Sequence, residues 1–203
     1  MQAEWRTGEI AAIALAFAAG CLPSARLVAR LMSGRSIEEL GDGKPGAANV
    51  YRSLGIGPGA VVLTLDALKS LVPAAALRAS GGSDTAVAVA AAAAVAAHIT
   101  IVGGQGVATG LGAGFAIDGP ATCAAVGSAV GGTCLGRSAH GVLAAMVVFP
   151  VAYGLRRRSW VATARPAMIV ALLIAARLRG RPGAGWPGST RLALSRLLID
   201  QDG

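Results

Sequence analysis

Three long stretches without charge constrain this chain more than any other feature of its sequence. No Asp, Glu, Lys or Arg lies between Asp84 and Asp118, between Asp118 and Arg137, or between Arg137 and Arg156. About 20 predominantly apolar residues are enough for a helix to cross the hydrocarbon core of a bilayer. Composition agrees, because 14% of the residues are charged, against roughly 25% in a typical soluble domain. The sequence therefore predicts an all-α polytopic membrane protein.

The apolar segments predict six to seven short transmembrane helices. The expected helical segments are residues 9–32, 56–79, 86–101, 107–117, 121–135, 140–154 and 160–176. Residues 107–117 and 121–135 are each too short to span comfortably, and the turn residues between them favour a tight helical hairpin. Residues 1–203 are expected to form a single membrane domain, with a polar cytoplasmic tail at about 180–203.

Lys and Arg predict the orientation of these helices. They are dense in the loop after the first helix and in the C-terminal tail, and such residues favour the cytoplasmic side. The N-terminus is then expected outside and the Gly-rich loops and C-terminus in the cytoplasm. Seven crossings would place Arg156, Arg157 and Arg158 outside, against this tendency, whereas six crossings or one re-entrant segment would not. The net charge of +8 suits anionic lipid headgroups and acidic substrates, while the hydropathy argues against nucleic acid as a partner.

Two Gly-rich loops on the same predicted side are the first candidates for a binding site. They cover residues 41–55 and 103–112, and Ser138 lies at the next return to that side. Glycine lets backbone N–H groups turn toward an oxyanion, and Lys44 and Arg52 would add positive charge. Phosphate is the ligand class that such a concavity favours. The alternative is that glycines 103–112 only allow close helix packing.

A charged pair within an apolar segment favours a structural role. Asp66 and Lys69 are three residues apart, so a helix places them on one face as an ion pair, and lone charges inside a membrane would be expensive. The three cysteines, by contrast, have no spacing typical of a metal site or a disulfide framework.

Four segments of the chain together resemble a known family. They read AGCLPSARLVARLM, GDGKPGAANVYRSLG, LTLDALKS and GGQGVATGLG, and their order and spacing are similar to those of the acyl-phosphate glycerol-3-phosphate acyltransferases. The resemblance covers about the first two thirds of the chain. It implies a seven-helix enzyme of the bacterial plasma membrane that transfers a fatty acyl group from acyl phosphate to the sn-1 hydroxyl of glycerol 3-phosphate. The product would be lysophosphatidic acid for phospholipid synthesis, and no metal or other cofactor would be needed.

The resemblance also implies which residues form the site. The first family signature is kept at several positions but has Asp42, Lys44 and Ala48 where the family has Ser, Asn and Thr. The second has Gln105 in place of Lys, and Ser138 matches the third. The implied catalytic residues are His98, Ser138 and Lys44. The implied phosphate-binding residues are Gly43, Gly46, Asn49, Arg52, Gly103, Gly104, Gln105, Gly106 and Thr109.

A second hypothesis remains open beside the enzyme. The family Lys is replaced by Gln105, and no Asn follows Asn49 and no Glu follows Glu39 to match the family's C-terminal pair. A catalytically degenerate member would bind a lipid or lipid phosphate, or serve as a membrane subunit for a partner protein. A transporter is disfavoured, since the sequence has no internal repeat of the kind that transporters show.

Overall fold

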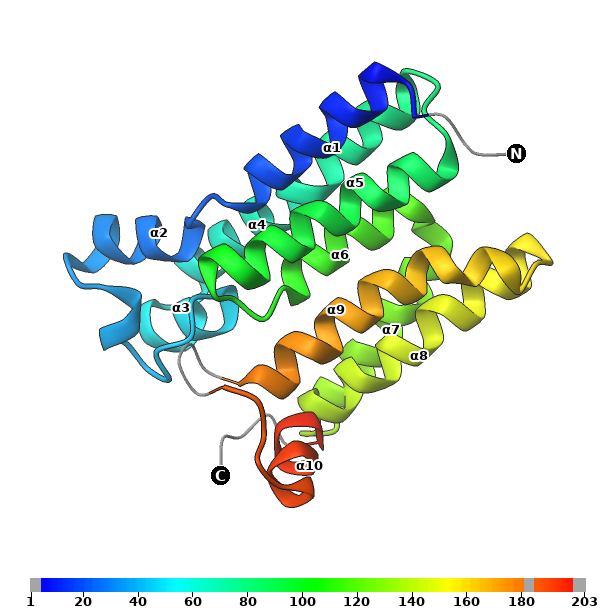
Figure 1. Cartoon of the computed structure of the whole chain (residues 1–203). Coiled ribbons are helices and arrows are strands. Elements are labelled where there is room, and N and C mark those ends of the chain that lie inside the picture. The colour runs from blue at the N-terminus through cyan, green and yellow to red at the C-terminus, as the bar shows by residue number, and fades with distance from the viewer. Residues whose placement is uncertain (1–4, 181–184, 199–203) are drawn as a thin grey trace. The chain divides into compact units, whose positions relative to one another are not determined.

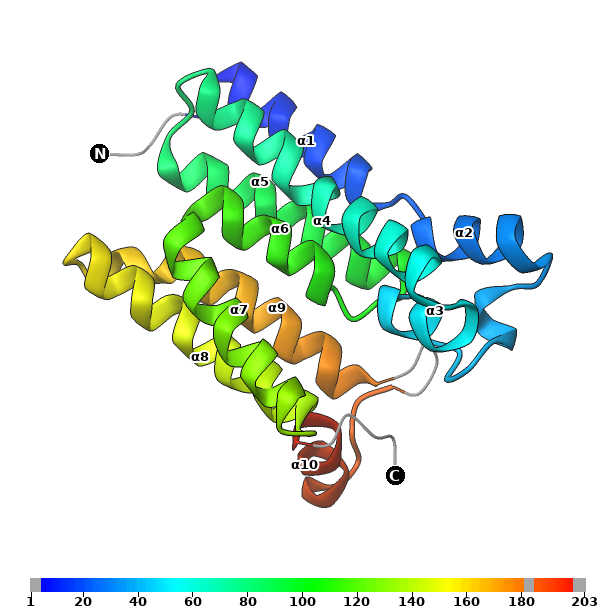
Figure 2. The ribbon, with the colours of Figure 1, turned by 180° about the vertical axis from the view of Figure 1, so that it is seen from behind.

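The computed structural model describes residues 5–180 and 185–198, and every regular element in these ranges is helical (Figures 1 and 2). The chain divides into two compact units, Met1–Ile117 and Asp118–Gly203, and each is considered by itself. Within the described residues, five helical segments are long and apolar enough to cross a membrane. They are Thr7–Ser33, Ile56–Ala79, Asp84–Val102, Ser138–Arg157 and Val161–Arg179, and Val107–Ile117 is a shorter apolar helix. The prediction of an all-α multi-pass protein is confirmed, while the prediction of a single membrane domain stays a prediction.

The first unit is a bundle with a small helical cap at one end. The bundle helices are α1 (Thr7–Gly20), α4 (Ile56–Ala79), α5 (Asp84–Ala97) and α6 (Val107–Ile117). Helix α5 packs against each of the other three, and most of its Ala-rich sequence is buried. Small side chains allow such close approach between helices in lipid. A single π-helical turn, η2 (His98–Val102), continues α5 to the second Gly-rich loop.

The first apolar segment is broken where the sequence predicted one helix over 9–32. Helix α1 ends at Gly20, and α2 (Ser24–Ser33) begins directly after Pro23. Proline has no N–H and its ring clashes with the preceding helical turn, so it ends or kinks a helix. The break leaves the Leu22 carbonyl outside the helical hydrogen-bond pattern, and Lys69 donates to that carbonyl.

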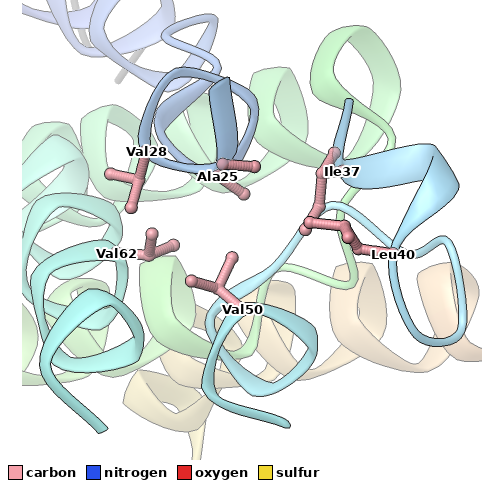
Figure 3. Close-up of a cluster of buried hydrophobic side chains, with 7 residues drawn as sticks. Ala25, Val28, Ile37, Leu40, Val50 and Val62 are labelled. Carbon is pink, nitrogen blue, oxygen red and sulfur yellow. The ribbon is translucent and has the colours of Figure 1, made fainter. Parts of the chain in front are cut away.

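The polar segment after α2 was predicted as a long surface loop, but about half of it is folded. It contains the 3₁₀ turn η1 (Ile37–Glu39) and the helix α3 (Ala47–Leu54). Apolar side chains from α2, η1, α3 and α4 meet in a buried cluster (Figure 3). Its members are Ala25, Val28, Ala29, Ile37, Leu40, Val50 and Val62. This cluster anchors the Gly-rich loop between η1 and α3 to the membrane helices.

The second unit consists of α7 (Gly119–Cys134), α8 (Ser138–Arg157), η3 (Val161–Thr163), α9 (Ala164–Arg179) and α10 (Thr190–Leu198). Helices α7 and α8 lie side by side and are in tight contact at Gly132 and Gly141, where an added Cβ atom would overlap the facing backbone. The predicted polar tail contains α10, which contacts α8 and α9. Residues 181–184 and 199–203 of that tail lie outside the described residues.

Candidate functional site

Asn49 holds the first Gly-rich loop in shape. Its side chain is buried on α3, and its amide nitrogen donates to the carbonyls of Leu40 at 2.9 Å and Lys44 at 3.1 Å. The amide oxygen accepts from the Asp42 backbone N–H at 3.3 Å. Both ends of the amide are therefore occupied within the protein. The geometry gives Asn49 an indirect role at the site, since its hydrogen bonds form the loop instead of pointing outward.

Glycine is required at two positions of this loop. Gly41 and Gly43 have φ of +52° and +72°, a region that other L residues rarely adopt. A Cβ atom on Gly41 would also overlap the Asn49 amide and lie 2.8 Å from Ser53 Oγ. Gly46, the residue before α3, has open space around it. The loop backbone is thus fixed by conformation at its centre and left accessible near the start of α3.

Arg52 lies at the edge of the loop and pairs with Asp42. The guanidinium contacts one carboxylate oxygen, and the other oxygen accepts the Lys44 backbone N–H at 3.1 Å. The Arg52 side chain is 54% exposed and that of Asp42 is 29% exposed. A surface ion pair of this kind contributes only about 0–1 kcal/mol to stability, so a competing anion such as phosphate would displace the carboxylate without a large penalty.

The second Gly-rich loop meets the first at Gly104. A Cβ atom on Gly104 would overlap His98 Nε2 and lie 2.9 Å from the Pro45 carbonyl oxygen. Gly103 and Gly106, on either side, have φ of +82° and +75°. The two loops therefore come together over the imidazole edge of His98, and only glycine leaves room for that approach.

His98 also contacts a buried ion pair behind the loops. Lys69 Nζ lies 2.5 Å from Asp66 Oδ1 and 3.5 Å from His98 Nδ1, and all three side chains are less than 5% exposed. Ser24 completes the group by donating to Asp66 and accepting from Lys69 at 2.9 Å. The ion pair that the sequence predicted is confirmed, and its contact with His98 was not foreseen. We call these four side chains the buried polar cluster.

The remaining predicted residues lie in different surroundings. Thr109 is fully buried in α6, and among the described residues its hydroxyl has no hydrogen-bond partner, while its carbonyl accepts from Ser70 Oγ at 2.6 Å. Gln105 is half-buried between Gly104 and Gly106. Ser138 belongs to the second unit, where it is exposed as the first residue of α8. Arg177 donates to the next carbonyl of that helix, on Ala139, at 3.3 Å.

Comparison with known sequences gives a consistent result. Residues 10–182 match the family described as glycerol-3-phosphate acyltransferase. Proteins of that name from Hydrogenovibrio crunogenus and Geobacter sulfurreducens are 39% and 40% identical to this chain over 132 and 109 residues. These alignments cover 63% and 51% of this chain, but only 61% and 56% of those relatives. A protein of the same name from Anaeromyxobacter dehalogenans is 34% identical over 199 residues, which cover 92% of this chain and 86% of that relative.

Two solved structures share the fold. The chain matches PlsY, an integral membrane glycerol 3-phosphate acyltransferase, in its glycerol 3-phosphate form with a TM-score of 0.76 and 26% identity, over 83% of this chain and 88% of that one. The lysophosphatidic acid form of PlsY matches with a TM-score of 0.73 and 24% identity, over 83% and 87% of the two chains.

Proposed function

Because the chain belongs to the glycerol-3-phosphate acyltransferase family, we propose that it transfers a fatty acyl group from acyl phosphate to the sn-1 hydroxyl of glycerol 3-phosphate. The product is lysophosphatidic acid, which feeds phospholipid synthesis. The observation that carries this proposal is the meeting of the two Gly-rich loops over His98, at Gly104 and Pro45. Backbone N–H groups of such loops suit the phosphate groups of both substrates.

The proposed reaction requires no nucleophile from the protein. The substrate hydroxyl attacks the acyl carbonyl and inorganic phosphate leaves, so the protein contributes orientation and charge stabilisation. The proposed catalytic residues are Lys44, His98 and Ser138. The proposed phosphate site comprises Gly43, Gly46, Arg52, Gly103, Gly104, Gln105, Gly106 and Thr109, with Asn49 acting through the loop that it holds.

The site is proposed to face the cytoplasm. In the proposed topology, residues 1–203 form one membrane domain in a bacterial plasma membrane. The N-terminus lies outside, and the Gly-rich loops and the C-terminus lie in the cytoplasm. Acyl phosphate would arrive from the inner leaflet, and glycerol 3-phosphate from solution. The hydrogen bond from Arg6 to the Gly81 carbonyl places the start of α1 beside the α4–α5 turn, so these two segments lie on the same side of the membrane, as the proposed topology requires.

The test is acceptor-dependent phosphate release by the purified protein in lipidic mesophase. We expect release from palmitoyl phosphate to require glycerol 3-phosphate. Arg52→Ala should lower the acceptor-dependent rate at least tenfold, because a charged hydrogen bond to phosphate contributes about 1.5–3 kcal/mol. The matched control is Arg30→Ala, which removes the same charge from an exposed position on α2.

A folded protein without acceptor-dependent release would overturn the proposal. The alternative is then a degenerate member that binds a lipid phosphate or serves as a membrane subunit. In such a protein the Arg52 guanidinium would stay paired with Asp42.

A further inference from the structure

The two ring nitrogens of His98 face different surroundings. Nδ1 points into the buried polar cluster, 3.5 Å from Lys69 Nζ and 3.9 Å from Asp66 Oδ1. Nε2 lies against Gly104, where the two Gly-rich loops meet. A neutral imidazole carries one proton, and the partner of one nitrogen decides which nitrogen holds it. The buried polar cluster can therefore determine what His98 offers to the loops.

The hydrogen bonds of the buried polar cluster leave little freedom at Nδ1. Ser24 Oγ donates to Asp66, so its lone pairs face Lys69, which donates to it at 2.9 Å. Lys69 also donates to Asp66 at 2.5 Å and to the Leu22 carbonyl at 2.6 Å. An ammonium group has three donors and no acceptor, and these three bonds use all of the donors, so Lys69 acts on Nδ1 through its positive charge. A proton on Nδ1 would point at this ammonium, while a lone pair there is attracted to it.

The competing arrangement requires Nδ1–H to bond the carboxylate. The nearest Asp66 oxygen is 3.9 Å from Nδ1, which is beyond the range of an N–H···O hydrogen bond of about 2.7–3.2 Å. That same oxygen already accepts from Ser24 and Lys69. The contacts of Nδ1 therefore favour an acceptor at this nitrogen.

We propose that Lys69 holds His98 in the tautomer with the proton on Nε2, so that His98 presents a hydrogen-bond donor to the site at the Gly-rich loops. The donor would serve an anionic oxygen of a bound phosphate or of the reacting acyl group. Lys69, Asp66 and Ser24 are positioning residues that act through His98. The assignment of the tautomer does not depend on the proposed function. The use of the Nε2 donor in acyl transfer rests on that function.

The tautomer is measured directly by nitrogen NMR on protein labelled with ¹⁵N-histidine. The chain has two histidines, and the exposed His140 is removed with His140→Gln, so one imidazole gives all the signals. We expect Nε2 to show the chemical shift of a protonated nitrogen and Nδ1 that of an unprotonated one. A proton on Nδ1, or on both nitrogens, would overturn the proposal.

Paired substitutions test whether Lys69 sets the tautomer. Asp66→Asn with Lys69→Met removes the ion pair without leaving one buried charge, and we expect both tautomers of His98 to become populated. The matched control is Asp84→Asn with Arg78→Met, which removes an exposed ion pair of 3.0 Å elsewhere on α4 and α5 and should leave the spectrum unchanged. An unchanged tautomer in the first variant would overturn the role of Lys69. If that variant does not fold, the spectrum of the protein with an intact ion pair still decides the tautomer.

Transfer assays separate a donor from a base. The amide of His98→Gln can still donate an N–H, whereas His98→Ala cannot. We expect His98→Gln to retain at least about tenfold more activity than His98→Ala, a difference equivalent to about 1.4 kcal/mol. Equal activities would overturn the donor role. A wild-type protein without transfer would instead count against the proposed function, and the NMR result would stand.

Discussion

Asn49 and Asp42 show how single side chains shape the first Gly-rich loop. Asn49 forms hydrogen bonds with three backbone groups of residues 40–44, and Asp42 pairs with Arg52. Asn49 fixes the loop backbone, whereas Asp42 neutralises the guanidinium beside the loop. Substitutions at the two positions should therefore have different effects.

Asn49→Ala should destabilise the protein and disorder the loop. It removes the three hydrogen bonds that Asn49 makes to the loop backbone, together with the contact to Ser53, so we expect a loss of about 2 kcal/mol, given about 0.5–1.5 kcal/mol per bond. Thermal unfolding in detergent measures it. Ser53→Ala removes one donor at 3.3 Å from the same amide and is the control, with an expected loss below about 1 kcal/mol. Equal stabilities of Asn49→Ala and wild type would contradict the role of Asn49.

Asp42→Ser should strengthen the binding of glycerol 3-phosphate. It frees the Arg52 guanidinium, so we expect the KM for glycerol 3-phosphate to fall several-fold while stability changes by less than about 1 kcal/mol, because the pair is exposed. Glu39→Ser, which removes the exposed Arg35–Glu39 pair of the same loop region, should leave the KM unchanged. A higher KM in Asp42→Ser would show that Arg52 does not bind the phosphate.

The sequence predicted individual contacts well where the partners are close along the chain. The spacing of Asp66 and Lys69 indicates an ion pair on one helical face, as the structure has it. Ser24 and His98 contact that pair from 42 and 29 residues away in the sequence. A local sequence pattern cannot predict contacts between residues so far apart. Arg52 likewise reaches Asp42 from ten residues away, because the start of α3 lies between them.

At the scale of elements, breaks in the helices matter as much as their lengths. Apolar segments predicted the long helices, since a helix that crosses a bilayer needs about 20 predominantly apolar residues. Helix α3 was missed, because its eight residues include polar groups and Gly flanks it on both sides. Its apolar side, at Val50, is recognisable only once the cluster with α2 and η1 is seen (Figure 3).

Gly104→Ala should separate the two Gly-rich loops. Its methyl group would overlap the His98 ring and press on the Pro45 carbonyl, so we expect transfer to fall more than tenfold with the fold retained. Circular dichroism and the phosphate-release assay measure the two properties. Gly57→Ala adds the same methyl group to α4 where no neighbouring atom lies within 4 Å, and should keep full activity. Undiminished transfer in Gly104→Ala would show that the contact of the loops is dispensable.

At the scale of the whole molecule, Arg156 and Arg157 bear on the number of crossings, because both contact Asp118. Asp118 Oδ1 lies 3.1 Å from Arg156, and its other oxygen lies 3.9 Å from Arg157. These contacts put the start of α7 beside the end of α8. This arrangement agrees with seven crossings, in which Asp118 and these arginines share the outer side.

The seven-crossing topology makes a specific labelling prediction. In a cysteine-free background, Ser159→Cys should react with a membrane-impermeant maleimide in intact cells, whereas Ser36→Cys, before η1, should react only after lysis. A fluorescent reporter fused after residue 203 should be active in the cytoplasm. Labelling of Ser36→Cys in intact cells would reverse the proposed orientation, and protection of Ser159→Cys would favour six crossings.

The early end of α1 ties the protein to the thickness of its host membrane. Its fourteen residues form a helix of about 21 Å at 1.5 Å per residue, shorter than a hydrocarbon core of about 30 Å, so the crossing Thr7–Ser33 also needs part of α2 beyond the break at Pro23. Bilayer thickness is therefore expected to act on that break, where the Leu22 carbonyl accepts from Lys69, which also contacts His98. Transfer measured in vesicles of increasing acyl-chain length should then decline in thick bilayers, which would make the catalyst responsive to the lipid that its own pathway produces.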